Sequence, residues 1–197
     1  TLVHQDRFAS VKGGAPGCKS EASMYLVVGA TGLVGRAVAQ QLRKQACEVR
    51  ALLRGGVAHA EARSLALAGV DIVAGDLRDP LAVAAACTGV DPSICTATSM
   101  PGAGGDPLRR AGQGGARGLI AAAERAGVRR FVYTSFSANI RVDSPLTSAK
   151  RSCEARLAAS PIQSVILQPS FFMEVWLGPY LGFDASRAHA RIYGDGK

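Results

Sequence analysis

The chain has 197 residues and a formal net charge of +8, with 48% hydrophobic and 19% charged residues. This length corresponds to about one domain, and the apolar content is too high and the charge density too low for a disordered chain. The uninterrupted apolar runs fall far short of the roughly 20 residues that span a bilayer. We therefore expect one folded domain without a transmembrane segment.

The positive excess comes mainly from 18 arginines, against 5 lysines, and these are dispersed along the chain. Because no run of five or more basic residues occurs, we expect a solvated basic surface and no nucleic-acid partner, with a dedicated nucleic-acid or membrane surface as the alternative. The five cysteines form no Cys-x-x-Cys pair, so no metal site is expected. We expect reduced, mostly buried thiols and a reducing, cytoplasmic compartment.

Residues 1–23 lack apolar periodicity and contain the chain-breaking sequence GGAPG at positions 13–17. This composition predicts a loose N-terminal extension, followed by a folded domain over residues 24–197. If the extension is the remnant of a processed transit sequence, the compartment is an organelle, either a plastid or the mitochondrial matrix.

From Met24 on, short apolar runs alternate with segments of helical periodicity. The expected strands are residues 24–29, 48–53, 70–74, 93–97, 130–134 and 163–167. The expected helices are residues 32–46, 60–68, 80–87, 108–126, 146–159 and 173–177, with a loose start at 108–126 because of Gly112 and Gly118. The alternation predicts parallel strands joined by right-handed crossovers, a Rossmann-type doubly wound α/β fold with helices on both faces.

The first strand-to-helix turn has the pattern G-x-x-G-x-x-G. It consists of Gly29, Ala30, Thr31, Gly32, Leu33, Val34 and Gly35. Gly29 permits the sharp exit from the strand, Gly32 lets the backbone approach a pyrophosphate, and Gly35 lets the helix pack closely. A strand before the turn and a helix after it predict a dinucleotide site at the helix N-terminus, with a tight turn that binds no ligand as the alternative.

The end of the second strand indicates which dinucleotide binds. A carboxylate there would favour NAD(H), but the sequence continues with Arg54, Gly55 and Gly56. Arg54, joined by Arg36, can pair with a 2′-phosphate by charge-assisted hydrogen bonds. We therefore predict that the site binds NADP(H) in preference to NAD(H). The alternative is that Arg54 is merely a solvated surface residue.

Two further strand ends supply candidate contacts to the cofactor. Asp76 can accept a hydrogen bond from the adenine amino group while Leu77 lies against the ring; a turn or helix cap before Asp79 is the alternative for Asp76. Ala97 and Thr98, after the fourth strand, present small residues near the nicotinamide-side ribose.

These segments, together with AGVRRFVYTS at 126–135 and LQPSFFME at 167–174, resemble an atypical short-chain dehydrogenase/reductase of the NmrA-like, NAD(P)-binding group. The resemblance extends over residues 24–197. It implies either a quinone-type or other small-molecule reductase, or a cofactor-binding redox sensor or assembly factor without turnover. Family members continue beyond the position of Lys197 into a substrate cap, so we expect the acceptor site to be largely absent from this chain.

The superfamily places a Tyr-x-x-x-Lys pair on the helix after the fifth strand. Lys150 matches the lysine, as a candidate catalytic residue that orients the nicotinamide ribose, but Leu146 replaces the tyrosine and Tyr133 lies on a strand. A surface ion pair with Glu154 is the alternative for Lys150. The missing tyrosine is compatible with a quinone-like acceptor, because a hydroquinone anion can take its proton from water, and it is unfavourable for a simple alcohol dehydrogenase. As a feature by itself it favours a cofactor-binding subunit without turnover, whereas Lys150 favours a reductase.

The remaining candidates flank the nicotinamide. Ser135 ends the fifth strand, and Pro169 and Phe171 or Phe172 follow the sixth strand as a wall of the pocket; ordinary core aromatics are the alternative. Two functions follow: an NADPH-dependent reductase of a small electrophilic, quinone-like acceptor, or an NADP(H)-binding regulatory or assembly subunit with a protein partner.

Overall fold

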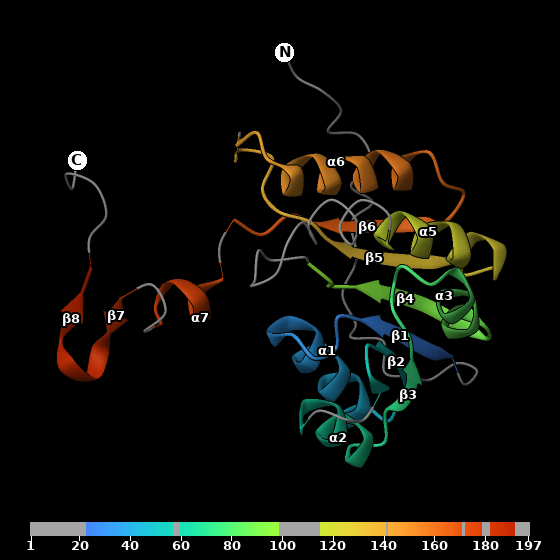
Figure 1. Cartoon of the computed structure of the whole chain (residues 1–197), viewed down its shortest axis with the longest axis horizontal. Coiled ribbons are helices and arrows are strands. Elements are labelled where there is room, and N and C mark those ends of the chain that lie inside the picture. Colours follow the sequence, from blue (N-terminus) through green and yellow to red (C-terminus); the bar gives the residue numbers. More distant parts are fainter. Residues whose placement is uncertain are drawn as a thin grey trace.

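Six parallel strands form the central sheet of the computed structural model, which describes residues 23–56, 60–98, 115–140, 142–170, 172–178 and 182–191. The strands are β1 (Met24–Val28), β2 (Glu48–Leu53), β3 (Asp71–Ala74), β4 (Val90–Cys95), β5 (Arg130–Thr134) and β6 (Gln163–Leu167). Their order in the sheet is β3-β2-β1-β4-β5-β6 (Figure 1). This order confirms the predicted Rossmann-type α/β fold.

Helices cover both faces of the sheet. They are α1 (Leu33–Lys44), α2 (Ala60–Leu67), α3 (Pro80–Cys87), α5 (Ala116–Arg125), α6 (Pro145–Ala158) and the short α7 (Met173–Trp176). One core cluster joins Val27 and Val49 of the sheet to Leu65 of α2, and also includes Ala39 of α1. The other joins Leu26 to residues of α3, α5 and α6. Burial on both faces explains why the central strands are continuous apolar runs.

The fourth strand differs from its prediction, since it runs over Val90–Cys95 rather than residues 93–97. Pro92 has no N–H to donate to a neighbouring strand, and a proline therefore argues against an inner strand. In the structure, the pairing of β4 with β1 shifts register between Met24 and Leu26. This local irregularity accommodates Pro92 within the strand.

Beyond β6, the chain forms α7 and a small antiparallel ribbon of β7 (Phe183–Asp184) and β8 (His189–Ala190), which lie beside the main sheet in Figure 1. Across the described residues, no helix has the length and apolarity needed to cross a membrane. The predicted extension up to residue 22 lies outside the described residues, as do Gly112 and the predicted start of its helix.

Three cysteines match the prediction of buried, free thiols: Cys87, Cys95 and Cys153. Cys47 is also buried, but it is disulfide-bonded, so the expectation of a reduced thiol is wrong at this position.

Candidate functional site

The carboxyl ends of β1 and β4 mark the point at which the strand order reverses. β1 lies between β2 and β4. From β1 the chain continues through β2 to β3 at one edge of the sheet, and from β4 it continues through β5 to β6 at the other edge. In open α/β sheets, ligands bind in the crevice outside this point. The turn from Gly29 to Gly35 follows β1 here, and Ala97 and Thr98 follow β4.

The glycines of the first turn are required by close contacts. Gly29 has φ +91°, and a Cβ on it would lie 2.7 Å from the amide nitrogen of Ala97. A Cβ on Gly35 would lie 2.2 Å from the carbonyl oxygen of Gly29. Gly32 is exposed, and its Cβ would meet only the Gly29 oxygen, at 3.3 Å. Gly29 and Gly35 therefore hold the strand, turn and helix together, while Gly32 leaves the outer side of the turn open.

The N-terminus of α1 is open as well. Its N-cap residue, Gly32, makes no side-chain capping hydrogen bond, and the helical bonding begins with the Arg36 amide, which donates to the Gly32 carbonyl at 2.9 Å. The amides of Leu33, Val34 and Gly35 have no carbonyl one turn earlier in the helix. Together with the positive end of the helix dipole, these amides are suited to bind an anion such as a pyrophosphate.

Both predicted phosphate arginines lie near this turn. Arg54 is exposed directly after β2, and Arg36 is half-buried in the first turn of α1. The ion pairs found among the described residues involve other arginines. Arg36 and Arg54 therefore keep their guanidinium groups available for an anionic ligand.

Asp76 forms a tight turn with a residue that sequence reasoning missed. Its Oδ1 accepts hydrogen bonds from the backbone N–H (2.8 Å) and Nε (2.9 Å) of Arg78, and its Oδ2 accepts one from Arg78 Nη2 at 2.8 Å. These bonds, with a smaller contribution from the charge of Arg54, hold the pKa of Asp76 below its usual value. Asp79, not Asp76, caps α3 by accepting from the Leu81 amide. The contact of Asp76 with adenine stays a prediction.

Lys150 is buried rather than on the surface, with 4% of its area exposed. Its Nζ donates to the Thr134 carbonyl at 2.6 Å and to Thr98 Oγ1 at 3.1 Å, and it lies 3.5 Å from the Ala97 carbonyl oxygen. The predicted alternative, a surface ion pair with Glu154, is therefore wrong. Burial lowers the pKa of Lys150. The ammonium joins the ends of β4 and β5 beside the switch point.

Glu154 holds Ser135 instead. The Ser135 hydroxyl donates to Glu154 Oε1, which also accepts from Arg151 Nη1 at 2.6 Å and Gln168 Nε2 at 3.1 Å. Ser135 itself is 5% exposed. Sequence reasoning assigned Glu154 only as a partner of Lys150, although its place one turn after Lys150 on α6 indicated that it faces the same strand end.

Arg151 completes this set of α6 side chains. Its guanidinium donates to the carbonyls of Phe136 (3.2 Å) and Ser137 (2.9 Å) and lies 4.9 Å from the centre of the Phe136 ring. We call Lys150, Arg151 and Glu154 the α6 clamp. Between them they bind residues 134, 135, 136 and 137 in succession, and so fix the chain as it leaves β5.

Tyr133 cannot supply the missing phenol. Its side chain is 2% exposed in the core, where burial strongly raises its pKa and Lys150 Nζ lies 4.9 Å from the ring centre. Leu146 occupies the first turn of α6 without a proton to transfer.

The segment after β6 is only partly described. The Pro169 carbonyl accepts from the Ser137 amide at 2.9 Å, which places Pro169 beside the α6 clamp. Phe171 lies outside the described residues. Phe172 is 37% exposed, so the alternative of an ordinary core aromatic is wrong for this residue.

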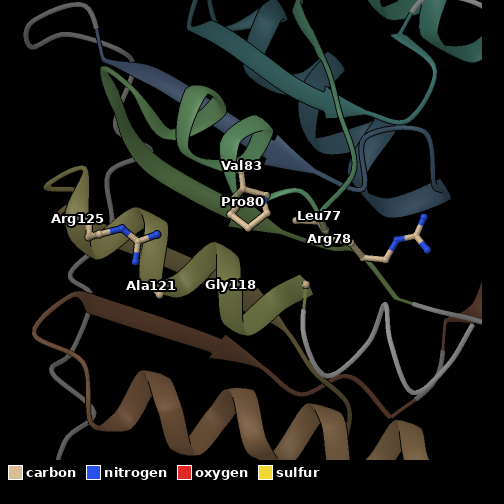
Figure 2. A pocket seen from close by; sticks show the side chains of 8 residues that line it. Leu77, Arg78, Pro80, Val83, Gly118, Ala121 and Arg125 are labelled. Carbon is tan, nitrogen blue, oxygen red and sulfur yellow. The ribbon is translucent and has the colours of Figure 1, made fainter.

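A pocket of about 380 Å³ lies between α3 and α5 (Figure 2). Leu77, Pro80 and Val83 line one side, and Gly118 and Ala121 line the other. In Figure 2 the side chain of Arg125 runs along α5, whereas that of Arg78 extends away from the space between the helices. The exposed Arg78 nevertheless belongs to the residues that line this pocket, next to Leu77.

Comparison with known proteins identifies the family. The model of the NmrA-like family matches residues 21–191. The chain belongs to the NmrA-like family. It is 33% identical over 153 residues to the NAD(P)H azoreductase of Xenophilus azovorans, covering 77% of this chain and 49% of that protein.

Two further relatives have different functions. The photosystem II assembly factor Ycf39 of Trieres chinensis is 31% identical over 79% of this chain and 48% of its own length. The structure of the NADPH-dependent quinone oxidoreductase QOR2 of Escherichia coli, in complex with NADPH, has a TM-score of 0.63 and 28% identity over 78% of this chain and 51% of that chain. The chain spans about half the length of the curated relatives that it matches.

Proposed function

We propose that this protein is an NADPH-dependent reductase that acts on a small electrophilic, quinone-like acceptor. The observation that carries the proposal is the uncapped, glycine-lined N-terminus of α1 at the switch point of the sheet. When bound, NADPH supplies a hydride to the acceptor. An azoreductase and a quinone oxidoreductase among the similar proteins support this reaction class.

Each part of the site has a role in the proposal. The amides of residues 33–35 bind the pyrophosphate, and Arg54 with Arg36 binds the 2′-phosphate. Ala97, Thr98 and Ser135 lie along the nicotinamide half, with Pro169 as part of its wall. Lys150 orients the nicotinamide ribose by exchanging its longest contact, at 3.5 Å to the Ala97 carbonyl, for a ribose hydroxyl.

The lack of a tyrosine at the position of Leu146 limits the chemical class of acceptor that the protein can reduce. Neither Leu146 nor the buried Tyr133 delivers a proton, so the reduced acceptor must be stable enough as an anion to take its proton from water. A hydroquinone meets this condition and a simple alkoxide does not. We therefore propose quinones rather than simple ketones as substrates.

The second candidate is an NADP(H)-binding assembly or regulatory subunit without turnover. Leu146 at the tyrosine position and the similarity to photosystem II assembly factors favour it. In this case the cofactor stabilises a conformation that a protein partner recognises, and a plastid location fits the chloroplastic relative. Oxidation of NADPH, followed at 340 nm with a panel of quinones, separates the two functions: binding without oxidation supports the subunit.

Cofactor preference is tested with Arg54→Ala. Loss of charge-assisted hydrogen bonds to the 2′-phosphate is expected to weaken NADPH binding about 10- to 150-fold and leave NADH binding unchanged. The matched control is Arg129→Ala, because Arg129 is exposed directly before β5, at the amino ends of the parallel strands, whereas Arg54 follows the carboxyl end of β2. Equal losses for NADPH and NADH would contradict the role of Arg54.

A further inference from the structure

The hydrogen bonds between Asp76 and Arg78 leave the Asp76 carboxylate with one open acceptor position. A carboxylate offers about four lone-pair positions on its two oxygens. Arg78 occupies two on Oδ1, through its backbone N–H and Nε, and one on Oδ2, through Nη2. Among the described residues no donor occupies the remaining position on Oδ2, and its direction is fixed because the guanidinium fork holds the carboxylate plane.

The same contacts make Asp76 an acceptor only. They hold the pKa of the carboxyl below its usual value, so that the group stays ionised and has no proton to donate. The Asp76 side chain is 26% exposed and that of Arg78 is 59% exposed. An ion pair so exposed contributes little to the stability of the fold. Its main effect is therefore to fix the orientation of the Asp76 carboxylate.

The location of this pair connects it with the proposed cofactor. Asp76 lies two residues after β3 and within electrostatic reach of Arg54, the proposed contact of the 2′-phosphate on the adenosine ribose. Leu77, between the two charged residues, supplies an apolar surface. An open acceptor, an apolar side chain and a nearby phosphate arginine match an adenine base with its exocyclic amino group.

We propose that Arg78 is a positioning residue that sets base specificity through Asp76. This inference rests on the proposed function, since it concerns the same dinucleotide. Arg78 leaves Asp76 one acceptor direction, which receives the 6-amino group of adenine. In hypoxanthine a carbonyl oxygen replaces that amino group, and its lone pairs would face those of the carboxylate. The site should therefore reject a hypoxanthine dinucleotide.

The experiment compares the dissociation constants of NADPH and its hypoxanthine analogue for the full chain. Wild type is expected to bind NADPH at least 10-fold more tightly. Arg78→Ala should reduce this ratio to 3-fold or less, and Asp76→Ala should abolish it. Because Arg78 acts through Asp76, adding Arg78→Ala to Asp76→Ala should change the ratio no further.

Arg129→Ala is the matched control, because Arg129 is likewise exposed and paired with an aspartate, Asp91, at 2.6 Å. It should keep the wild-type ratio, and circular dichroism should show that all variants are folded. A wild-type ratio near one, equal weakening of both dinucleotides by Arg78→Ala, or an effect of Arg78→Ala that persists without Asp76 would each overturn the inference. If wild type binds no NADPH at all, the proposed function itself fails.

Discussion

Glu154 stabilises the end of β5 by accepting hydrogen bonds from Ser135, Arg151 and Gln168 on one carboxylate oxygen. Glu154→Ala would leave these donors without their acceptor, and Ser135 is buried. We expect the free energy of unfolding to fall by about 1–3 kcal/mol. Urea denaturation measures this change.

The control for this substitution is Glu61→Ala, because Glu61 is exposed in the first turn of α2. Its loss should change the free energy of unfolding by less than about 0.5 kcal/mol. Equal effects of the two substitutions would show that the Glu154 network adds nothing to stability.

Lys150 illustrates why part of the site could not be predicted. Four-residue spacing correctly places Lys150 and Glu154 on one face of a helix. It does not say which groups of other strands compete for them. In the fold, the Lys150 ammonium donates a hydrogen bond to the Thr134 carbonyl, and the Glu154 carboxylate accepts one from the Ser135 hydroxyl. These partners become visible only when β5 is packed against α6.

At the scale of the element, two glycines in helices should respond oppositely to alanine. A Cβ at the exposed Gly118 of α5 would meet nothing within 4 Å, whereas one at Gly35 of α1 would lie 2.2 Å from the Gly29 oxygen. Gly118→Ala should therefore stabilise the protein by about 0.5–1 kcal/mol. Gly35→Ala should destabilise it and weaken NADPH binding.

Thermal unfolding and a cofactor titration of the two variants provide the measurements. Stabilisation by Gly35→Ala would disprove the close packing of α1 on the turn. A lower melting temperature for Gly118→Ala would show that its side of α5 is not open.

The boundaries of helices and strands were predictable where the apolar pattern agrees with the capping and turn-forming residues. Residues 48–53, 80–87, 130–134 and 163–167 have the predicted bounds, and Asp79 with Pro80 marks the start of α3 by ordinary capping. The fourth strand was displaced because a shift of register, which depends on β1, admits Pro92. The Arg78 contact was missed for a similar reason, because it depends on the turn at residues 76–78.

The whole molecule should lose stability at alkaline pH. Burial raises the pKa of Cys153, and raises the pKa of Cys87 and Cys95 to about 11. Thiols in the unfolded chain ionise near pH 9.0. Above that pH the folded state binds more protons than the unfolded state, so the free energy of unfolding falls as the pH rises from 9 toward 11.

Lys150 acts in the opposite direction, because its lowered pKa makes the folded state the first to lose that proton. The loss from pH 8 to pH 10 should be roughly 1 kcal/mol for each of Cys87 and Cys95, with Cys153 adding to the loss and Lys150 acting against it. Urea denaturation at both pH values tests this, and Cys87→Ala should show a smaller loss. A free energy of unfolding that is constant over this range would contradict the argument.

The α6 clamp also has a consequence for backbone dynamics. The amides of Ser135 and Ser137 donate to the carbonyls of Leu167 and Pro169 at 2.8 and 2.9 Å, although both lie beyond the last residue of β5. Opening them requires that Arg151 and Glu154 first release this segment. Hydrogen exchange at these two amides should therefore be as slow as within the sheet, so that the segment after β5 is as rigid as a strand.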